Sequence, residues 1–365
     1  MSDDPNPTFG ANNRVPEFGT RRATITDVAR EAGTGKTNIS RYLNGMTSVL
    51  SPELRERIEV AIAKLDYRPN QMARGLKRGR NRLIGMLLAD LTNPYSVEVL
   101  QGVEAACHAL GYMPLICHAA NEVDMERRYL QLLDLWRRRR DRQCVGRQGR
   151  TAERLHTRRD SVVLVDRTVE GIVTDMVGLD NLAAVALATR HLAEQGFDEL
   201  LFIVQPVTHV SSRRLRQATF RETVAALDSA GANRLHSATL VIDLADAGPA
   251  LADLDRRVAA ARDAGRRVAL FAANGPVALV AVHLKSRFGG DWQAQIALMS
   301  IDDSEWAQLA GMTTVRQPTY DIGRRAVEFL HERLGGASMA AHECLLPGEL
   351  VVRASTERAN ERGIV

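Results

Sequence analysis

A short run of hydrogen-bonding side chains near the N-terminus has the composition of a surface that reads nucleic acid. The polar residues of KTNISR can all donate hydrogen bonds and none is acidic; they are Lys36, Thr37, Asn38, Ser40 and Arg41. On a helix in the major groove, Lys or Arg can read guanine, and Ser, Thr or Asn can bond bases or phosphates. Residues 21–82 contain fourteen Lys and Arg against six Asp and Glu, a net charge of +8. The pattern favours DNA binding, while a small helical bundle with a solvated charged face stays open as the alternative.

A second set of polar side chains follows the apolar runs of the rest of the chain. Its members stand directly after strand-like segments; they are Asn93, Tyr95, Asp166, Arg167, Asn274, Asp302 and Asp303. The carboxyl ends of parallel strands meet along one edge of a sheet, where α/β proteins bind small ligands. Each residue taken singly could equally be a helix cap or a loop residue. Their common placement predicts a ligand cleft.

Capping and turn signals define the element that carries the first set. Either threonine of TITD (residues 24–27) can cap a helix, and Gly33 supplies the positive φ that ends it and starts a tight turn. A second helix is expected over residues 36–43, and Ser51-Pro52 opens a third as N-cap and first helical residue. Three short helices with a glycine turn predict a helix-turn-helix domain over residues 23–69.

The chain after Asn81 alternates buried apolar runs with amphipathic helices. RLIGMLLAD, YMPLICHAA, VVLVD, ELLFIV, SATLVI, VALFAAN and QIALMSID read as strands, and helix-like segments separate most of them. Repeated βα units predict doubly wound parallel sheets. These units are too many for one sheet, so residues 81–365 are expected to form two α/β lobes with the cleft between them.

Several chemistries are not supported by the residues. GTGKT lacks the first glycine of a phosphate-binding loop and follows a helix instead of a strand. No nucleophile elbow, metal-binding cysteine or histidine spacing, or apolar run of eighteen residues occurs. We therefore expect no enzyme, no metal, no cofactor and no membrane contact. Residues 1–22 read as a disordered tail without a signal peptide, which favours a cytoplasmic protein.

TITDVAREAG…SRYLNG followed by LDYRPNQMARGLKRG closely resembles the lactose/galactose repressor (LacI-GalR) family. The resemblance implies a DNA-binding repressor with a periplasmic-binding-protein-like core, acting as a homodimer on a palindromic operator. It implies a hinge helix over residues 70–80, with Leu76 as the leucine that wedges into the minor groove. Thr24 and Asn70 join the expected DNA contacts. The chain departs from the family at Thr34-Gly35, where Val-Ser is usual, and at Asn38, where threonine is frequent.

The resemblance extends to the cleft. Asn93 and Tyr95 match the effector-contacting loop, and further matches follow along the chain; they are Arg216, Asn274, Asp302 and Gln317. Gly275 replaces an acid that often holds sugar hydroxyls, while Arg167 and Arg216 remain, which favours an anionic ligand. The core also resembles the branch that represses ketogluconate utilisation. We therefore expect a sugar acid such as 2-ketogluconate; a neutral sugar or phosphosugar, a sugar-binding protein without DNA regulation, and a sugar-modifying enzyme are the alternatives.

Residues 137–159 do not fit this pattern, because ten of the twenty-three are arginine. The family pattern places a buried strand here, and the longest apolar run is Cys144-Val145. Since unpaired buried arginines are costly, no central parallel strand is expected. The block is an extra phosphate-binding loop, an insertion in place of a strand, or the product of a reading frame that shifted and recovered near Ser161. Intact family sequence on both sides favours the frame shift.

Overall fold

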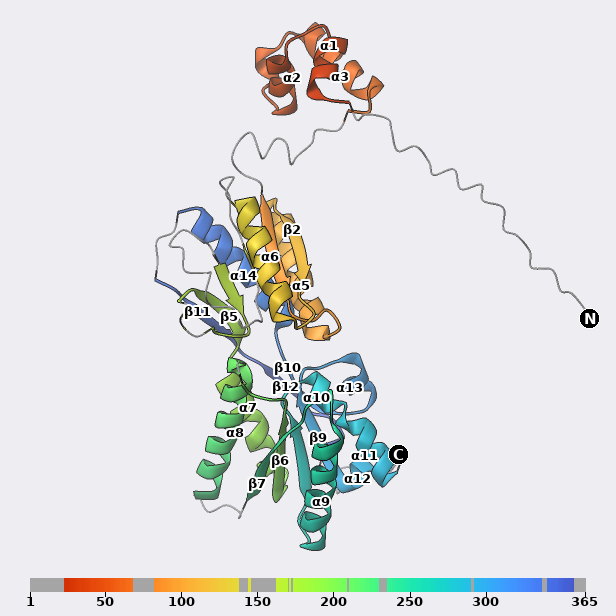
Figure 1. Cartoon of the computed structure of the whole chain (residues 1–365), viewed down its shortest axis with the longest axis vertical. Helices are drawn as coiled ribbons and strands as arrows, with labels where there is room; N and C mark the ends of the chain where they lie inside the picture. The colour runs from red at the N-terminus through yellow and green to blue at the C-terminus, as the bar shows by residue number, and fades with distance from the viewer. Residues whose placement is uncertain are drawn as a thin grey trace, which may run out of the picture. The chain divides into compact units, whose positions relative to one another are not determined.

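The computed structural model describes residues 23–67, 82–137, 144–145, 162–169, 171, 173–208, 210–229, 235–289, 292–336 and 340–357 (Figure 1). The predicted tail (1–22), the predicted hinge with Asn70 and Leu76, and all of the arginine-rich block except residues 137, 144 and 145 lie outside these ranges. The chain divides into two compact units, residues 1–80 and 81–365.

The first unit contains three α-helices, α1 (Ile25–Glu31), α2 (Lys36–Leu43) and α3 (Pro52–Lys64), with a short 3₁₀ turn at Thr47–Val49. Thr24 caps α1 in a capping box with Asp27, and the Ser51 hydroxyl accepts from the Leu54 amide at the start of α3. Gly33 has φ +59° in the turn between α1 and α2. The helices share a small buried core built around Val28, Ile39 and Ile58. The predicted helix-turn-helix architecture is confirmed.

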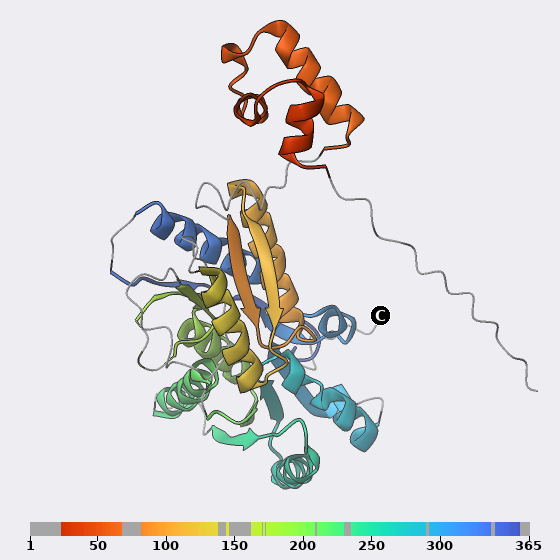
Figure 2. The same cartoon turned by 45° about the horizontal axis from the view of Figure 1, so that its top comes forward.

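The first lobe of the second unit is a six-stranded sheet in the order β11-β5-β4-β3-β1-β2, and all of its pairs are parallel. Its strands are β1 (Leu83–Leu88), β2 (Met113–His118), β3 (Cys144–Val145), β4 (Val162–Val165), β5 (Asp175–Leu179) and β11 (Glu343–Leu346). Helices α5 (Pro94–Leu110) and α14 (Thr319–Leu334) pack on one face. Helix α6 (Val123–Arg137) packs on the other, as Figure 2 shows.

The second lobe is also six-stranded, in the order β12-β10-β9-β8-β6-β7, and only β12 runs antiparallel to its neighbour. Its strands are β6 (Glu199–Val204), β7 (His236–Val241), β8 (Val268–Ala272), β9 (Ile296–Ile301), β10 (Thr313–Arg316) and β12 (Glu349–Val351). Helices α7 (Asn181–Glu194) and α8 (Ser211–Ser229) cover one face. The helices of the other face are α9 (Gly248–Asp263), α10 (Gly275–Ala278), α11 (Val280–Phe288), α12 (Trp292–Gln295) and α13 (Glu305–Leu309). The predicted two-lobed, doubly wound fold is confirmed.

The chain passes between the two lobes three times. It crosses after β5, again after β10 where Gln317 and Pro318 lead into α14, and a third time between β11 and β12. Several polar residues expected in the cleft stand at strand ends beside these crossings. The fold therefore brings residues far apart in sequence to one inter-lobe region.

The expectation that the arginine-rich block contributes no central strand is wrong. Cys144–Val145 forms β3, which pairs in parallel with both β1 and β4. A strand of two residues needs only two apolar side chains, so the flanking arginines do not prevent its pairing. Because β3 contains only Cys144 and Val145, the sheet stays continuous without taking arginine into the strand.

The close approach of α5 and α14 gives a first testable prediction. A Cβ atom at Gly102 on α5 would overlap the carbonyl oxygen of Tyr320 on α14, and one at Gly323 would overlap the carbonyl oxygen of Val99. Gly102→Ala should therefore push the helices apart and lower the free energy of unfolding by about 1–3 kcal/mol. Denaturation of the full chain measures it. Gln101→Ala, at an exposed position of the same helix, is the matched control; equal stability of the two variants would contradict the close packing.

Candidate nucleic-acid interface and ligand cleft

The outer face of α2 presents the residues expected to read DNA. Lys36, Thr37, Ser40 and Arg41 are exposed, whereas Asn38 is half-buried and donates from Nδ2 to the Thr34 hydroxyl at 2.9 Å. Ile39, on the opposite face, is fully buried. The structure thus places four of the predicted residues on one accessible surface and ties Asn38 partly to the turn before the helix.

Other polar groups of the module serve its own structure. Arg57 donates to the carbonyl oxygens of Ala32 (2.6 Å) and Gly33 (2.9 Å), and so satisfies the end of α1. Lys64 pairs with Glu31, and Arg30 pairs with Asp27. The Thr24 hydroxyl accepts from the Asp27 amide at 3.4 Å and donates to the Asp27 carboxylate at 2.6 Å, so this predicted DNA contact is also the helix cap. Among the ion pairs of the described module, none involves Lys36 or Arg41.

The missing serine cap of α2 gives a second prediction. Gly35 is the N-cap at φ −79° and ψ 152°, makes no side-chain cap, and has open space where a Cβ would stand. Gly35→Ser should stabilise α2 by a few tenths of a kcal/mol, because serine can accept from a first-turn amide. Slower hydrogen exchange of the α2 amides in the full chain is the expected readout. Gly35→Ala adds a Cβ without the hydroxyl and should not slow exchange; equal protection in both variants would contradict the capping explanation.

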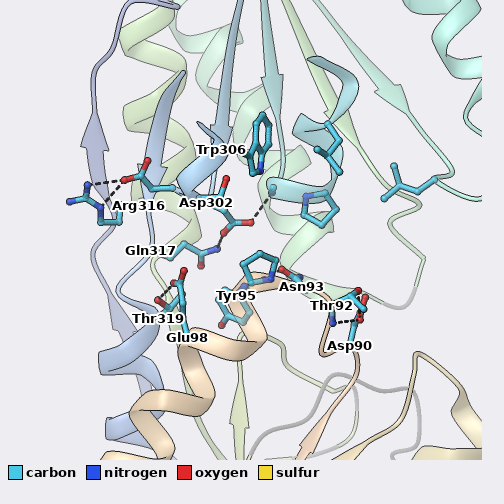
Figure 3. A pocket seen from close by; sticks show the side chains of 17 residues that line it. Asp90, Thr92, Asn93, Tyr95, Glu98, Asp302, Trp306, Arg316, Gln317 and Thr319 are labelled. Carbon is cyan, nitrogen blue, oxygen red and sulfur yellow. Dashed lines mark hydrogen bonds and ion pairs between the residues drawn. The ribbon is translucent and has the colours of Figure 1, made fainter. Parts of the chain in front are cut away.

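A cavity of about 610 Å³ lies between the lobes of the second unit (Figure 3). Its walls come from the start of α5, the starts of α10 and α13, and the crossing after β10. Five of the predicted residues line it; they are Asn93, Tyr95, Asp302, Asp303 and Gln317. Four acids (Asp90, Glu98, Asp302 and Asp303) and a partly apolar wall with Trp306 also line it.

Asp302 is held in position at the end of β9. Its Oδ2 accepts from the Gly275 amide at 2.8 Å, and its Oδ1 accepts from Gln317 Nε2 at 2.5 Å. Its φ of +88° is rare for a non-glycine residue and costs conformational energy, as is common at binding sites. A Cβ at Gly275 would stand 3.3 Å from Asp302 Oδ2, so the glycine leaves this carboxylate room. Gln317 Oε1 is buried and has no hydrogen-bond partner among the described residues.

Asn93 and Tyr95 stand at the start of α5. Asn93 is its N-cap and accepts from the Tyr95 amide at 3.1 Å. The Tyr95 side chain is buried, and its hydroxyl has no hydrogen-bond partner among the described residues. Burial, followed by the charge of Asp166, raises the pKa of Tyr95 well above its usual range, so the phenol stays protonated at neutral pH. The hydroxyl is therefore a buried donor without an acceptor among the described residues.

Arg216 is buried beside Asp166 but does not line the cavity. It donates from Nε to Asn181 Oδ1 and from NH1 to the Ala273 carbonyl oxygen, both at 2.6 Å. Its NH2 lies 3.8 Å from Asp166 Oδ1. Asp166 ends β4 with φ +65°, and its Oδ1 has no hydrogen-bond partner among the described residues. Arg216 thus ties the first crossing, the end of β8 and Asp166 together.

Arg167 and Asn274 also stand beside the cavity and outside its wall. Arg167 Nε lies 3.4 Å from Asp166 Oδ2. Asn274 caps α10 by accepting from the Val277 amide and donates from Nδ2 to Gln205 Oε1 at 3.0 Å. The predicted residues therefore form two groups, one around Asp302 in the cavity and one around Asp166 behind it.

Two further residues of the second group, Gln205 and Arg213, were not predicted from the sequence. Arg213 donates to Gln205 Oε1 at 2.7 Å and to the Pro206 carbonyl oxygen at 3.0 Å. α8 begins at Ser211, so Arg213 lies in its first turn. The serines before Arg213 are the helix-start signal that was available in the sequence.

Within the described residues, no group of three or more His, Cys, Asp or Glu side chains is arranged to hold a metal ion. None of the helices in the described ranges is long and apolar enough to cross a bilayer. A helix-turn-helix module on the same chain as a two-lobed binding core with an inter-lobe cavity defines a ligand-responsive, DNA-binding transcription regulator.

Family comparisons agree with this class. Residues 24–70 match the model of bacterial regulatory proteins of the lacI family. Residues 81–243 match the periplasmic binding proteins and sugar binding domain of the LacI family, and residues 189–356 match the periplasmic binding protein-like domain. The HTH-type transcriptional regulator PtxS of Pseudomonas aeruginosa is 38% identical, over 92% of this chain and 96% of that protein. KdgR of Bacillus subtilis is 31% identical, over 92% and 98%. The chain belongs to the lacI family of bacterial transcription regulators.

Solved structures share the fold. The lac repressor dimer bound to operator and the anti-inducer ONPF superposes with a TM-score of 0.75, at 21% identity, over 92% of this chain and all of that chain. The complex of the transcriptional regulator CelR with cellobiose gives a TM-score of 0.63 at 24% identity, with the same coverage. At these identities the likeness supports the architecture alone.

Proposed function

We propose that this protein is a repressor that binds a palindromic operator as a homodimer in the cytoplasm and releases it when a sugar acid such as 2-ketogluconate occupies the cleft. One observation carries the choice of ligand. Two arginines, Arg167 and Arg216, pair with a single carboxylate, Asp166, at 3.4 Å and 3.8 Å. Such an excess of positive charge in a largely buried site favours an anionic ligand, because the ligand's acid group would supply the missing counter-charge.

The residues around Asp302 suit the rest of such a molecule. Asp302 and Gln317 have acceptor oxygens at the cavity, and Tyr95 has a buried hydroxyl donor. Hydroxyl groups of a sugar acid can donate to the first two and accept from the third. The proposed contacts are therefore Asn93, Tyr95, Asp302 and Gln317 for hydroxyl groups, with Arg167 near the acid group and Arg216 and Asn274 fixing the geometry behind them.

A neutral sugar is the second candidate, since four carboxylates line the cavity. Carboxylates accept hydrogen bonds from sugar hydroxyls and repel an acid group. An acid ligand would be recognised mainly by the arginines around Asp166, and a neutral sugar mainly by the carboxylates that line the cavity. A phosphosugar is the third form of ligand that the arginines would accept.

A gel-shift titration separates these candidates. The full-length protein is first used to select an operator from a random duplex pool, and the complex is then titrated with 2-ketogluconate, D-fructose or fructose 6-phosphate. We expect release with the acid at concentrations where the neutral sugar has no effect. No response to any sugar acid would contradict the effector assignment, and stronger binding with the acid would make it a co-repressor.

The salt dependence of DNA affinity tests the operator role separately. A protein that contacts several phosphates loses affinity steeply between 50 and 200 mM salt, by about 10³–10⁵-fold for six to ten contacts. The proposed DNA contacts are Lys36, Thr37, Ser40 and Arg41 on α2, with Thr24, Asn38 and, outside the described residues, Asn70 and Leu76. A DNA affinity that does not change with salt concentration would favour a protein whose only function is to bind a ligand in the cleft. Product analysis after incubation with the three sugars tests the enzyme alternative, for which we expect no turnover.

The origin of residues 137–159 bears on the sensing lobe. We propose that the reading frame shifted there and recovered near Ser161. The coding sequence for residues 130–165, translated in all three frames, is the test. A conventional apolar strand in another frame supports the frame shift, whereas its absence from all frames supports a true insertion.

A further inference from the structure

Two residues where the chain enters α13, Ser304 and Trp306, line the cavity between the lobes. The turn that carries them is anchored by the residue before Ser304. The Asp303 side chain is buried, accepts from the Thr314 hydroxyl at 2.8 Å and pairs with Arg353 at 2.7 Å. Ser304 and Trp306 are therefore presented to the cavity on a fixed backbone, as a binding site requires.

The Ser304 hydroxyl has no partner in a place where a serine ordinarily has one. Ser304 is the N-cap of α13, with φ −73° and ψ 158°, yet its side chain makes no capping hydrogen bond. Its Oγ is buried and has no hydrogen-bond partner among the described residues. A serine N-cap usually accepts from a first-turn amide, and a buried hydroxyl without a partner costs free energy. A hydroxyl group of a ligand in the cavity would satisfy it.

Two other polar atoms without a partner in the described part of the chain line the same cavity. They are the Tyr95 hydroxyl and Gln317 Oε1, on side chains of residues that are 8% and 7% exposed. Together with Ser304 they come from three elements, namely α5, the crossing after β10 and the start of α13. Gln317 Oε1 can accept a hydrogen bond, and each of the two hydroxyls can donate or accept one. A molecule with several neighbouring hydroxyl groups satisfies such a set.

Trp306 belongs to an apolar part of the cavity wall. It is half-buried and packs against the core cluster of the second lobe. Pro276 and the exposed side chains of Leu244 and Leu279 also line the cavity, and Figure 3 shows Trp306 together with the polar residues. The face of an indole ring carries partial negative charge and attracts C–H groups. A cyclic sugar fits this wall, because its ring faces are apolar and its rim carries the hydroxyl groups.

We propose that Ser304 and Trp306 form a sugar-ring subsite of the cleft, in which the indole packs against a ring face and the Ser304 hydroxyl bonds a hydroxyl group of the rim. The assignment rests on the proposed function, because it takes the ligand to be a sugar, and it selects the ring form of that ligand. 2-Ketogluconate forms a ring when its terminal hydroxyl adds to the ketone and the hydroxyl proton passes to the ketone oxygen. Gluconate has no ketone or aldehyde and stays open, while its acid group carries the same charge.

Calorimetric titration of the full chain with 2-ketogluconate, D-fructose and D-gluconate tests the assignment. The wild type should bind 2-ketogluconate more tightly than gluconate. Trp306→Leu should weaken binding of 2-ketogluconate by about 10–100-fold, the range for loss of an aromatic contact, and should remove most of the preference over gluconate. Trp306→Phe keeps an aromatic face and should bind more tightly than Trp306→Leu. Gln308→Ala, at an exposed position of the same helix, should match the wild type.

Ser304→Ala separates ligand binding from folding. Because the hydroxyl makes no hydrogen bond among the described residues, its removal should leave the melting temperature of the unliganded protein unchanged or higher. Binding of 2-ketogluconate should weaken by about 3–10-fold. A lower melting temperature with unchanged binding would mean that the hydroxyl serves the fold of the turn, and would overturn its assignment to the ligand.

The outcomes separate this subsite from the proposed function. If the wild type binds 2-ketogluconate and both Trp306→Leu and Ser304→Ala bind it as tightly, the subsite is overturned while the sugar-acid function stands. If Trp306→Leu weakens 2-ketogluconate and gluconate equally, recognition of the ring is overturned. If the wild type binds fructose in place of the acid and Trp306→Leu loses it, the subsite stands and the acid assignment fails. A wild type that binds none of the three ligands contradicts both.

Discussion

Replacing Lys36 and Arg41 together by alanine is expected to lower operator affinity by about 10²–10³-fold. Both side chains are exposed on the outer face of α2, and neither takes part in the ion pairs of the described module. A contact from arginine or lysine to a base edge is worth about 1–3 kcal/mol, and the free energies of two separated contacts add. Fluorescence anisotropy with the selected operator, repeated at several salt concentrations, measures the effect.

The salt series shows what kind of contact was lost. Loss of base contacts relaxes sequence preference, whereas loss of phosphate contacts weakens all sequences alike and reduces the salt slope by about one per residue. Lys64→Ala is the matched control, because Lys64, the last residue of α3, is also exposed but pairs with Glu31 of α1. A double variant that binds within threefold of the wild type would exclude α2 as the recognition helix.

The N-terminal module is the part of the fold that local sequence signals determine best. The second helix was expected over residues 36–43, and α2 spans these residues. The cap at Ser51, the proline after it and the positive φ of Gly33 also agree with the structure. Each of these signals acts through backbone hydrogen bonds within a few residues, so the neighbouring sequence contains the information needed.

The sheets were harder to predict where a strand departs from an apolar run. Strand β5 (Asp175–Leu179) includes an aspartate and a glycine, and the prediction omitted it. Asp175 is buried at its start because Arg333, from α14, donates to both of its carboxylate oxygens at 2.7 Å. Strand β3 was excluded for its flanking arginines and nevertheless pairs over two residues. In both places a partner far away in sequence decides the outcome.

The residues of the cleft also divide into those that the local sequence indicates and those that depend on partners far away in sequence. Strand ends located Asn93, Tyr95, Asp302 and Asp303 at the cavity, because every parallel sheet directs its carboxyl ends to one edge, and the family resemblance added Gln317. The sequence could not indicate that the Arg216 side chain is bound by other parts of the protein. That depends on Asn181 and the Ala273 carbonyl oxygen, which come from two other elements and occupy Arg216.

Arg216→Met is the second variant with a large expected effect. It would leave the Ala273 carbonyl oxygen and Asn181 Oδ1 without their donor, and would remove the buried charge nearest to Asp166 Oδ1. Removing one partner of such a buried charged network costs about 3–5 kcal/mol. Urea unfolding of the full chain, followed by the fluorescence of Trp292 and Trp306 in the second lobe, should show this loss. Arg221→Met, at an exposed position of α8, controls for the change in helix sequence.

A double-mutant cycle separates the charge from the packing. Asp166→Asn removes the carboxylate of the cluster. In the Arg216→Met variant this carboxylate has already lost one of its neighbouring cations. If repulsion and pairing within the cluster matter, the combined variant should be more stable than the sum of the single effects predicts, by about 0.5–3 kcal/mol. Strict additivity would mean that Arg216 acts only through Asn181 and Ala273. In that case the excess positive charge around Asp166 would no longer support an anionic ligand, and the neutral-sugar candidate would become the better one.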